Sequence, residues 1–314
     1  MKKLIIFISV LALILCGCGG NEEPETTGAA TESPNETTAP VTEEGPDFSQ
    51  YANKATVLCY NIYYQDVDRR AENIQDLILK QDPGVLLLQE VSVDWIPYLQ
   101  SFMAENDYSY YGYGRYGGEL SAEDLKSGDQ FVPILWKNDL YDLVESGHFW
   151  LSSTPDIYSD AWVDGTISKY PRCVNWVILK DKQTGGEFVV CNIHTDPESD
   201  QVRTLSCQLT VKKMEEIRRG LPVVIGGDWN MGLTDSGYQI VTSSGYADVR
   251  VKAQTRELGG SFNAWGDRAD DNFAYGDHIF MSEDMAAEVF DVVDDYYDGE
   301  HISDHNPLLA ILYY

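Results

Sequence analysis

Residues 222–230 read Pro-Val-Val-Ile-Gly-Gly-Asp-Trp-Asn, and residues 303–307 read Ser-Asp-His-Asn-Pro. In the first stretch a β-branched run predicts a short buried strand, which leads through two glycines to Asp228. In the second stretch Asp304 and His305 stand side by side, just before another apolar run. Strand ends deliver side chains from a rigid scaffold to one rim of a sheet, where a site can be assembled. Both stretches therefore predict functional residues.

Other predicted strands end in the same way. The apolar residues before them lead directly into Asn61, into Gln89-Glu90 and into Asn192-Ile193-His194. Each residue alone has a simpler explanation: Asn61 as a turn former, Glu90 as the start of the next helix, and His194 as a donor to a backbone carbonyl. Asp228 after two glycines has the simple explanation of a turn residue. Their occurrence together, in this order, favours the functional interpretation.

The residue types indicate one kind of chemistry. Glu90 and Asp304 offer hard carboxylate oxygens and Asn61 an amide oxygen, a set that favours Mg²⁺, Mn²⁺ or Ca²⁺ over zinc. His194 and His305 are two of only five histidines, and both lie in these motifs. A carboxylate beside an imidazole raises its basicity, as a general acid or base requires. A cation with histidine donors can stabilise the charge of a phosphoryl-transfer transition state.

The rest of the chain predicts many strands and few helices. Helices are predicted at 68–80, 92–105 and 200–219, where apolar residues recur at three- and four-residue steps. Strands are predicted at 55–60, 85–88, 131–136, 141–151, 173–180, 187–193, 222–226, 260–265, 277–281, 288–293 and 306–312. This mixture predicts two packed sheets flanked by helices, within one domain over 48–314.

The order of these motifs resembles the endonuclease/exonuclease/phosphatase superfamily, also called the DNase I-like fold. The motifs are Tyr-Asn, Gln-Glu, Asn-x-His-x-Asp, Gly-Asp-x-Asn, Asp-His-Ile and Ser-Asp-His, and they extend over about 56–314. Two further stretches look like those of secreted bacterial members: Pro133-Ile134-Leu135-Trp136 and Gly147-His148-Phe149-Trp150-Leu151-Ser152. The resemblance implies an α+β fold: a four-layer α/β/β/α sandwich of two mainly antiparallel sheets flanked by helices.

The same resemblance implies roles for the cation and for the attacking water. Asn61 and Glu90 would bind a divalent cation, Mg²⁺ or alternatively Mn²⁺ or Ca²⁺, with Asp304 close to it. Asp228 and Asn230 would hold the attacking water and a phosphate oxygen.

It also implies the proton-transfer and phosphate-binding groups. His194 would donate to the phosphoryl group or to the leaving oxygen. Asp277 would orient His305, which would act as the general acid or base. Arg172 is a candidate phosphate contact, with a structural ion pair as the alternative.

Some positions differ from the family pattern. Thr195-Asp196-Pro197 stands where a bulkier residue and a second histidine are common, so leaving-group contacts are expected to differ. Asp129 replaces a more common Glu, and Ile302 a small residue or Pro. The loop 107–118 interleaves tyrosines with glycines. Within it Tyr111 and Arg115 are candidate substrate-binding residues, with ordinary aromatic packing as the alternative.

The N-terminus predicts export. Residues Leu4–Leu15 form an apolar run after two lysines, too short to span a bilayer, and lead into Cys16-Gly17-Cys18. This ending resembles the lipobox of bacterial lipoproteins, with lipid on Cys18. The alternative is a plain secretory signal. We therefore expect a signal peptide over 1–18, an acidic disordered tether over 19–47, and an extracytoplasmic, membrane-anchored domain.

The net charge and the cysteine spacing disfavour two classes of site, a lysine-rich DNA-binding surface and a cysteine metal site. The chain carries 51 acidic and 22 basic residues, a net charge of −29, and the tether holds only eight of the acidic ones. Such a domain repels polyanions, which disfavours a nuclease that binds duplex DNA through many lysines. The four cysteines after the signal lack metal-binding spacing; buried side chains are expected, and a disulfide stays open: Cys59, Cys173, Cys191 and Cys207.

These observations predict a monomeric, divalent-metal-dependent hydrolase of phosphoester bonds at the cell exterior. The class includes phosphodiesterases, phosphatases and nucleases, and the charge favours a small or headgroup phosphoester over nucleic acid. The alternative is a surface binding lipoprotein that keeps the fold without turnover. Such a protein would be expected to lose Glu90, Asp228 or His305, and all three are present.

Overall fold

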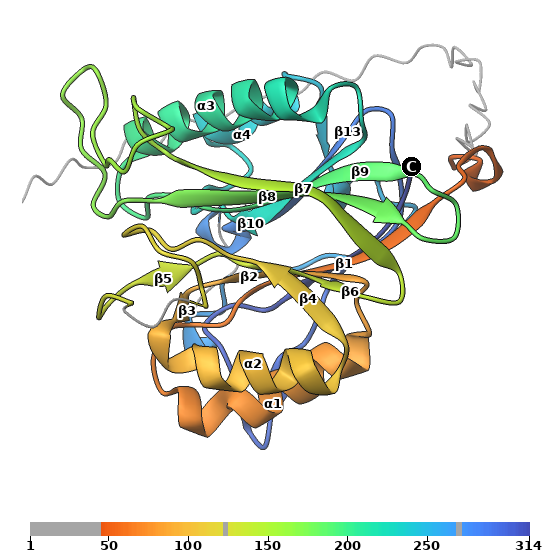
Figure 1. Ribbon diagram of the computed structural model, residues 1–314, viewed down its shortest axis with the longest axis horizontal. Helices are drawn as coiled ribbons and strands as arrows, with labels where there is room; N and C mark the ends of the chain where they lie inside the picture. Colours follow the sequence, from red (N-terminus) through yellow and green to blue (C-terminus); the bar gives the residue numbers. More distant parts are fainter. Residues whose placement is uncertain (1–44, 122–124, 268–271) are drawn as a thin grey trace, which may run out of the picture. The chain divides into compact units, whose positions relative to one another are not determined.

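The structure is a computed structural model that describes residues 45–121, 125–267 and 272–314 (Figure 1). The expected signal peptide, its Cys18 and the tether up to residue 44 lie outside the described residues. Residues Gly45–Tyr314 form one compact unit. None of the helices in the described ranges is long and apolar enough to cross a membrane.

The described chain contains two large sheets and five α-helices. The helices are α1 (Val67–Gln81), α2 (Ile96–Glu105), α3 (Asp200–Arg218), α4 (Ser236–Thr242) and α5 (Val249–Lys252). The strands are β1 (Lys54–Asn61), β2 (Val85–Gln89), β3 (Val91–Ser92), β4 (Tyr108–Tyr111), β5 (Gln130–Phe131), β6 (Ile134–Lys137), β7 (Tyr141–Trp150), β8 (Cys173–Asp181), β9 (Glu187–His194), β10 (Val223–Asp228), β11 (Tyr246–Asp248), β12 (Thr255–Glu257), β13 (Asp277–Ser282), β14 (Ala286–Val292), β15 (Tyr296–Tyr297), β16 (Glu300–His301) and β17 (Leu308–Tyr313).

The large sheets pack face to face between helices. One has the order β12-β14-β17-β1-β2-β6-β4, and the other β11-β13-β10-β9-β8-β7. The pairs β1–β2, β9–β10 and β12–β14 are parallel, and the other pairs in these sheets are antiparallel. Helices α1 and α2 cover the first sheet, and α3 and α4 the second (Figure 1). The predicted four-layer sandwich is confirmed.

Side-chain alternation along the strands builds three apolar layers. In β1, Val57 and Cys59 lie in the core between the sheets, whereas Leu58 and Tyr60 pack under the helices on the other face. This follows from the two-residue period of a strand. A polar residue that continues the inward series at a strand end, as Asn61 does, therefore lies between the two sheets.

Three predicted elements differ from the structure. Residues 260–265 do not form a strand: they make a single bridge, Phe262 to His305, and then a 3-10 turn. The helix predicted from residue 92 begins at Ile96, because the chain first pairs as β3 and turns once before Pro97. The strand predicted over 131–136 is split at Pro133, which has no N–H to donate to a ladder.

Candidate active site

Three adjacent strands bring three predicted residues into one row. His194 of β9 is the Cα partner of Asp228 of β10, and Asp228 is the partner of Asp277 of β13. All three continue the inward-facing series of their strands, and each is buried. Asn61 ends β1 in the opposite sheet and faces the same space. The fold therefore places these side chains at one end of the cleft between the sheets.

The glycine pair before Asp228 permits this close approach. A Cβ on Gly227, whose φ is +155°, would lie 2.0 Å from the carbonyl oxygen of Ile193 in β9. A Cβ on Gly226 would lie 2.4 Å from Leu87 in the opposite sheet. Glycine at 226–227 thus lets β10 sit tightly against both its neighbouring strand and the facing sheet.

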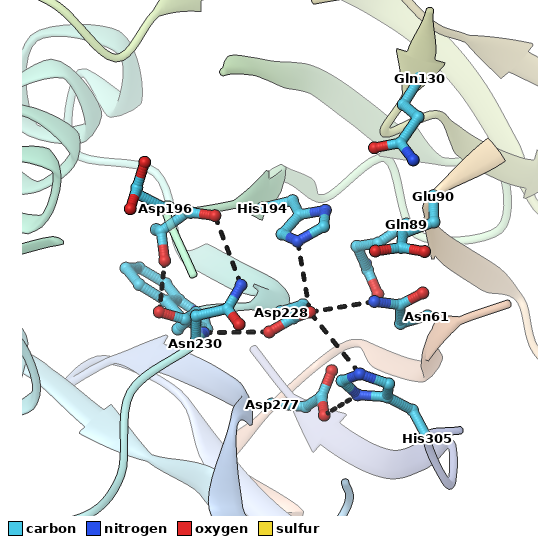
Figure 2. Close-up of polar contacts among 12 residues, drawn as sticks. Asn61, Gln89, Glu90, Gln130, His194, Asp196, Asp228, Asn230, Asp277 and His305 are labelled. Atoms are coloured by element: carbon cyan, nitrogen blue, oxygen red, sulfur yellow. Dashed lines mark hydrogen bonds and ion pairs between the residues drawn. The ribbon is translucent and has the colours of Figure 1, made fainter. Parts of the chain in front are cut away.

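Asp228 is the centre of the polar network (Figure 2). It accepts hydrogen bonds from Asn61 Nδ2 and from the backbone N–H of Asn230, both at 2.9 Å. His194 Nε2 lies 3.4 Å and His305 Nε2 3.9 Å from its Oδ2. Burial, and then the neighbouring charge of Asp277, raise the pKa of Asp228 above its ordinary value. A positive charge in the site would therefore be strongly favoured.

His305 and Asp277 form a buried pair. The imidazole Nδ1 lies 2.7 Å from Asp277 Oδ2. Burial alone would lower the pKa of His305, but the carboxylates of Asp277, Asp228 and Asp304 outweigh it and raise the pKa well above its ordinary value. With Nδ1 bound to Asp277, Nε2 faces the site and is the atom that can take or release a proton.

Asp228, Asp277 and His305 could also hold a cation by geometry alone. Among the described residues they place one ligand atom each within 4.8 Å of one another. A hydrogen-bonded acid–base group satisfies the same distances. Because Nδ1 of His305 is already occupied by Asp277, we interpret this trio as the proton-handling group.

Arg172 fixes the tautomer of His194. Its Nη1 lies 3.1 Å from His194 Nδ1, and a guanidinium can only donate. Nδ1 therefore accepts, and the proton stands on Nε2, which points at Asp228. Burial, followed by the charges of Arg172 and His305, lowers the pKa of His194 well below its ordinary value. His194 is thus a neutral imidazole that donates into the site.

Glu90 and Asp304 make the acidic wall. Glu90 follows β2 with φ +58°, a conformation that L-residues rarely adopt and that concentrates at functional sites. Burial raises the pKa of Glu90, and the charge of Asp304 raises it further. Asp304 Oδ1 is buried without a hydrogen-bond partner. Asn61 gives its Nδ2 to Asp228, so its Oδ1 lies on the side of Glu90 (Figure 2). These oxygens fit a hard divalent cation.

Asn61 and Asp277 lie outside the lining of the active-site cavity and are bonded to Asp228 and His305. Eight of the other predicted residues line this cavity, which has a volume of about 330 Å³. It contains Glu90, Arg115, Arg172, His194, Asp228, Asn230, Asp304 and His305. Arg115 is held in place because it donates to Gln130 Oε1 at 2.8 Å and to the Gly128 carbonyl at 2.7 Å, and it lies over the ring of Tyr170. The lining of the cavity therefore carries two arginines as well as the carboxylates of Glu90 and Asp304.

Tyr111 is not part of this lining. Its hydroxyl bonds His148 Nδ1 at 2.8 Å, and Tyr113 stacks on the same imidazole with centroids 3.7 Å apart. In the tyrosine-rich loop, Tyr111 and Tyr113 therefore pack on His148 of β7. Of the two predicted substrate-binding residues, Arg115 lines the cavity and Tyr111 does not.

Several residues of the site carried weaker signals in the sequence. Gln89 and Asn192 join the two sheets beneath the cavity, Gln89 Nε2 donating to Asn192 Oδ1 at 2.7 Å. Asn192 in turn donates to the carbonyls of Leu88 and Pro133. Both residues lie inside the motifs quoted above. They stand at strand positions that face the core between the sheets, where an apolar residue is usual, so a polar residue there could have indicated a role in the site. Tyr64, Gln130, Tyr170 and Phe262 also line the cavity. Phe262 belongs to Ser261-Phe262-Asn263, which resembles a Thr-Phe-Asn/His element of the family, whereas Tyr64 and Tyr170 had no distinctive pattern.

Three of the positions that differ from the family pattern, Asp196, Pro197 and Ile302, have structural explanations. Asp196 is buried, and its carboxylate accepts the backbone N–H groups of Lys169, Glu198 and Ser199. It therefore shapes the loop before α3, and Pro197 forms part of the cavity wall. Ile302 packs in the apolar layer beneath α1 and α2. The four cysteines of the described domain are buried and free, which leaves no disulfide among them.

The model of the endonuclease/exonuclease/phosphatase family matches residues 58–305. The chain belongs to this family. Its members hydrolyse phosphoester bonds and generally use divalent metal ions, and the buried Asp228–Asp277–His305 group lies inside the matched range. Comparison with curated proteins gave no match.

Several solved structures share the fold of this chain. A family protein from Bacteroides thetaiotaomicron is 29% identical, with a TM-score of 0.73, covering 83% of this chain and 96% of its own. A mannosyl-6-phosphatase from Bacteroides thetaiotaomicron VPI-5482 is also 29% identical, with a TM-score of 0.72 and coverage of 83% and 100%. The human nocturnin catalytic domain, at 17% identity, has a TM-score of 0.64 and coverage of 85% and 98%, a likeness of fold alone.

Proposed function

We propose that this protein is a divalent-cation-dependent phosphatase or phosphodiesterase that acts at the cell exterior. The observation that carries the proposal is the construction of the cavity. Its lining combines an acidic pair, one of whose buried oxygens has no partner, with two arginines and with His305, which is bonded to Asp277. A phosphoester needs charge neutralisation, oriented donors and a proton carrier, and each is supplied by a different part of this lining.

Glu90, Asp304 and Asn61 would hold the cation, Mg²⁺ or alternatively Mn²⁺ or Ca²⁺. When bound there it would neutralise charge on the phosphoryl oxygens and make a water more acidic. The unpartnered Asp304 Oδ1 supports this placement. Burial raises the pKa values of both carboxyl groups, and a further negative charge raises each of them: Asp304 for Glu90, and Asp277 for Asp304. Removal of the cation would leave like charges facing one another in a buried site.

The remaining side chains would bind and orient the phosphoryl group. His194 Nε2–H donates towards the site, and Arg172, whose pKa burial lowers only to about 10, stays charged beside it. Asn230 is fixed at Asp228, with its amide donating to the Thr195 carbonyl at 3.3 Å. Asp228 and Asn230 would hold the attacking water in line with the leaving oxygen.

Proton transfer would use His305. Water attacks phosphorus, the bond to the leaving oxygen breaks, and the proton lost by the water is balanced by one gained at the leaving group. Asp277 holds Nδ1, so Nε2 of His305 is the exchanging atom, 3.9 Å from Asp228. Asp277 acts by orienting the ring and stabilising its charged form.

The size and charge of the protein favour a small substrate. The cavity of about 330 Å³ suits a headgroup or a small phosphoester, and the net charge of −29 repels long polyanions. A relative at 29% identity is named a mannosyl-6-phosphatase. Location outside the cytoplasm, a lipid anchor at Cys18 and a monomeric state belong to the same proposal, supported by the sequence of residues 1–18.

A substrate panel tests this function. At one Mg²⁺ concentration, the full chain is assayed with p-nitrophenyl phosphate, bis-p-nitrophenyl phosphate and plasmid DNA. We expect turnover of at least one small ester, and a loss of about 10²–10⁴-fold in kcat for His305→Ala. His148→Phe, a histidine outside the cavity, serves as the control and should retain activity. Binding of phosphoesters with no turnover under any divalent metal would instead support a non-catalytic binding protein.

A further inference from the structure

A second cavity lies beside the active site. It has a volume of about 650 Å³, and neighbouring residues line the two cavities: Tyr63 and Ile302 line this one, and Tyr64 and Asp304 the active-site cavity. We name it the aromatic cavity, since its walls include Tyr63, Trp265 and Tyr296, with Asp66, Asn73 and Glu300 among the polar residues. The function proposed above uses none of these six side chains.

Short contacts connect its walls to the expected cation ligands. The backbone N–H of Tyr63 donates to Asn61 Oδ1 at 3.1 Å, and its ring lies 5.0 Å from that of Tyr64, which lines the active-site cavity. The carbonyl of Asp304 accepts the N–H of Ala264, the residue before Trp265. A substrate whose phosphoryl group lies at Glu90 and Asp304 therefore has this cavity next to it.

Trp265 is held in a costly conformation while much of its surface stays open. It is 44% exposed, and its φ of +61° follows a φ of +49° at Ala264, both in the left-handed region. The Asn263 side chain accepts the Trp265 N–H at 2.8 Å and donates to Asn306 at 2.6 Å, which fixes the turn. Such strain concentrates at ligand clamps, and exposure of a tryptophan gains nothing for folding.

The two inner rings form a corner over a buried arginine. Tyr63 and Trp265 have centroids 5.1 Å apart at 84°. The Arg70 guanidinium lies 5.4 Å and 5.8 Å from these rings, and it donates to the carbonyls of Ile62 and Ile302 at 2.7 Å. A cationic ligand is therefore disfavoured, because this positive charge already occupies the rings.

The charges around the cavity balance. Asp66 and Glu300 oppose Arg69 and Arg70, and Arg69 is paired with Glu300. A ligand of either sign gains little net attraction from such a lining. Asp66, Asn73 and Glu300 nevertheless offer hydrogen-bond acceptors and donors at the rim. The lining thus suits a neutral ring with one apolar face and many hydroxyl groups.

We propose that the aromatic cavity binds a neutral pyranose ring, the sugar unit that adjoins the phosphoester in the substrate. Binding of the sugar does not depend on the proposed function; only its assignment as part of a substrate rests on that function. The apolar face of the sugar packs on Trp265, its edge meets Tyr63, and its hydroxyl groups bond the polar rim. The substrate class is therefore a phosphorylated glycan.

Ligand-observed NMR on the full chain tests the cavity without reference to catalysis. Mannobiose is the probe, with choline chloride and adenosine as the cationic and nucleobase-bearing alternatives. We expect saturable mannobiose binding that Trp265→Ala weakens about five- to tenfold. Tyr158→Ala, at an exposed tyrosine outside this cavity's lining, is the matched control and should bind as the wild type does. If Trp265→Ala fails to fold, Tyr296→Ala carries the test, with weaker mannobiose binding again expected.

Three results would overturn the inference: no mannobiose binding by the wild type, equal binding by wild type and Trp265→Ala, or tighter binding of choline or adenosine. A parallel assay compares mannobiose 6-phosphate with p-nitrophenyl phosphate. Turnover of p-nitrophenyl phosphate without mannobiose binding rejects the sugar cavity and keeps the proposed function. Mannobiose binding without turnover of either ester supports the cavity and rejects the enzyme.

Discussion

At the scale of single residues, two hydrogen bonds assign different protonation states to the two histidines. Arg172 can only donate to His194, so His194 stays neutral with its proton on Nε2. Asp277 accepts from His305 and helps to raise the pKa of that imidazole. One histidine is thereby a fixed donor, and the other is the group that exchanges a proton.

Asp277→Asn tests this division. Loss of the carboxylate removes a negative charge that raises the pKa of His305, so the pKa falls. The limb of the kcat/KM profile that reports His305 should move to lower pH, whichever protonation state the reaction needs. The rate at the optimum should fall by about 10²-fold or more, because the ring loses its orientation. Profiles of p-nitrophenyl phosphate hydrolysis over about pH 5 to 9 measure both effects; an unmoved limb would rule out this pairing.

At the scale of elements, the close packing of β9, β10 and the facing sheet sets the positions of His194 and Asp228. Gly227→Ala places a methyl group against the Ile193 carbonyl, which belongs to backbone and cannot rotate away. We expect a loss of about 2–3 kcal/mol in the free energy of unfolding, measured by urea denaturation.

Gly259→Ala is the matched control, because a Cβ there meets nothing within 4 Å. Its free energy of unfolding should change by less than about 0.5 kcal/mol. Equal stability of the two variants would show that the packing at Gly227 is not the constraint described.

Much of the site could be predicted at this scale because strands repeat every two residues. Asn61, His194 and Asp228 stand at the ends of apolar strands, so the sequence predicts that they form one site; the structure brings them together from two facing sheets. The aromatic cavity could not be predicted in this way. Trp265 and Tyr63 are brought together by left-handed turns, and Trp265 lies in the segment 260–265, whose apolar residues suggested a strand. The conformation of residues 260–265 is set by tertiary contacts with residues 302–306.

At the scale of the whole molecule, the net charge of −29 should govern encounters with charged substrates. A protein that binds DNA through lysines loses affinity as salt rises. Here salt screens a repulsion, so kcat/KM for plasmid DNA relative to p-nitrophenyl phosphate should increase from about 20 to 200 mM NaCl. Initial rates on both substrates at the two ionic strengths measure this ratio. A ratio that decreases with salt would indicate a DNA-binding surface that the overall charge conceals.

The need for a cation at the acidic wall is the claim on which the enzyme depends. The most direct measurement is p-nitrophenyl phosphate hydrolysis by EDTA-treated protein as Mg²⁺ or Mn²⁺ is returned, for the wild type and for Glu90→Gln. We predict that EDTA abolishes the activity and that the metal restores it. Glu90→Gln should need at least about tenfold more metal for half-maximal rate, since it loses a charged oxygen ligand. Activity that persists in EDTA, or an identical metal dependence in the variant, would contradict this account.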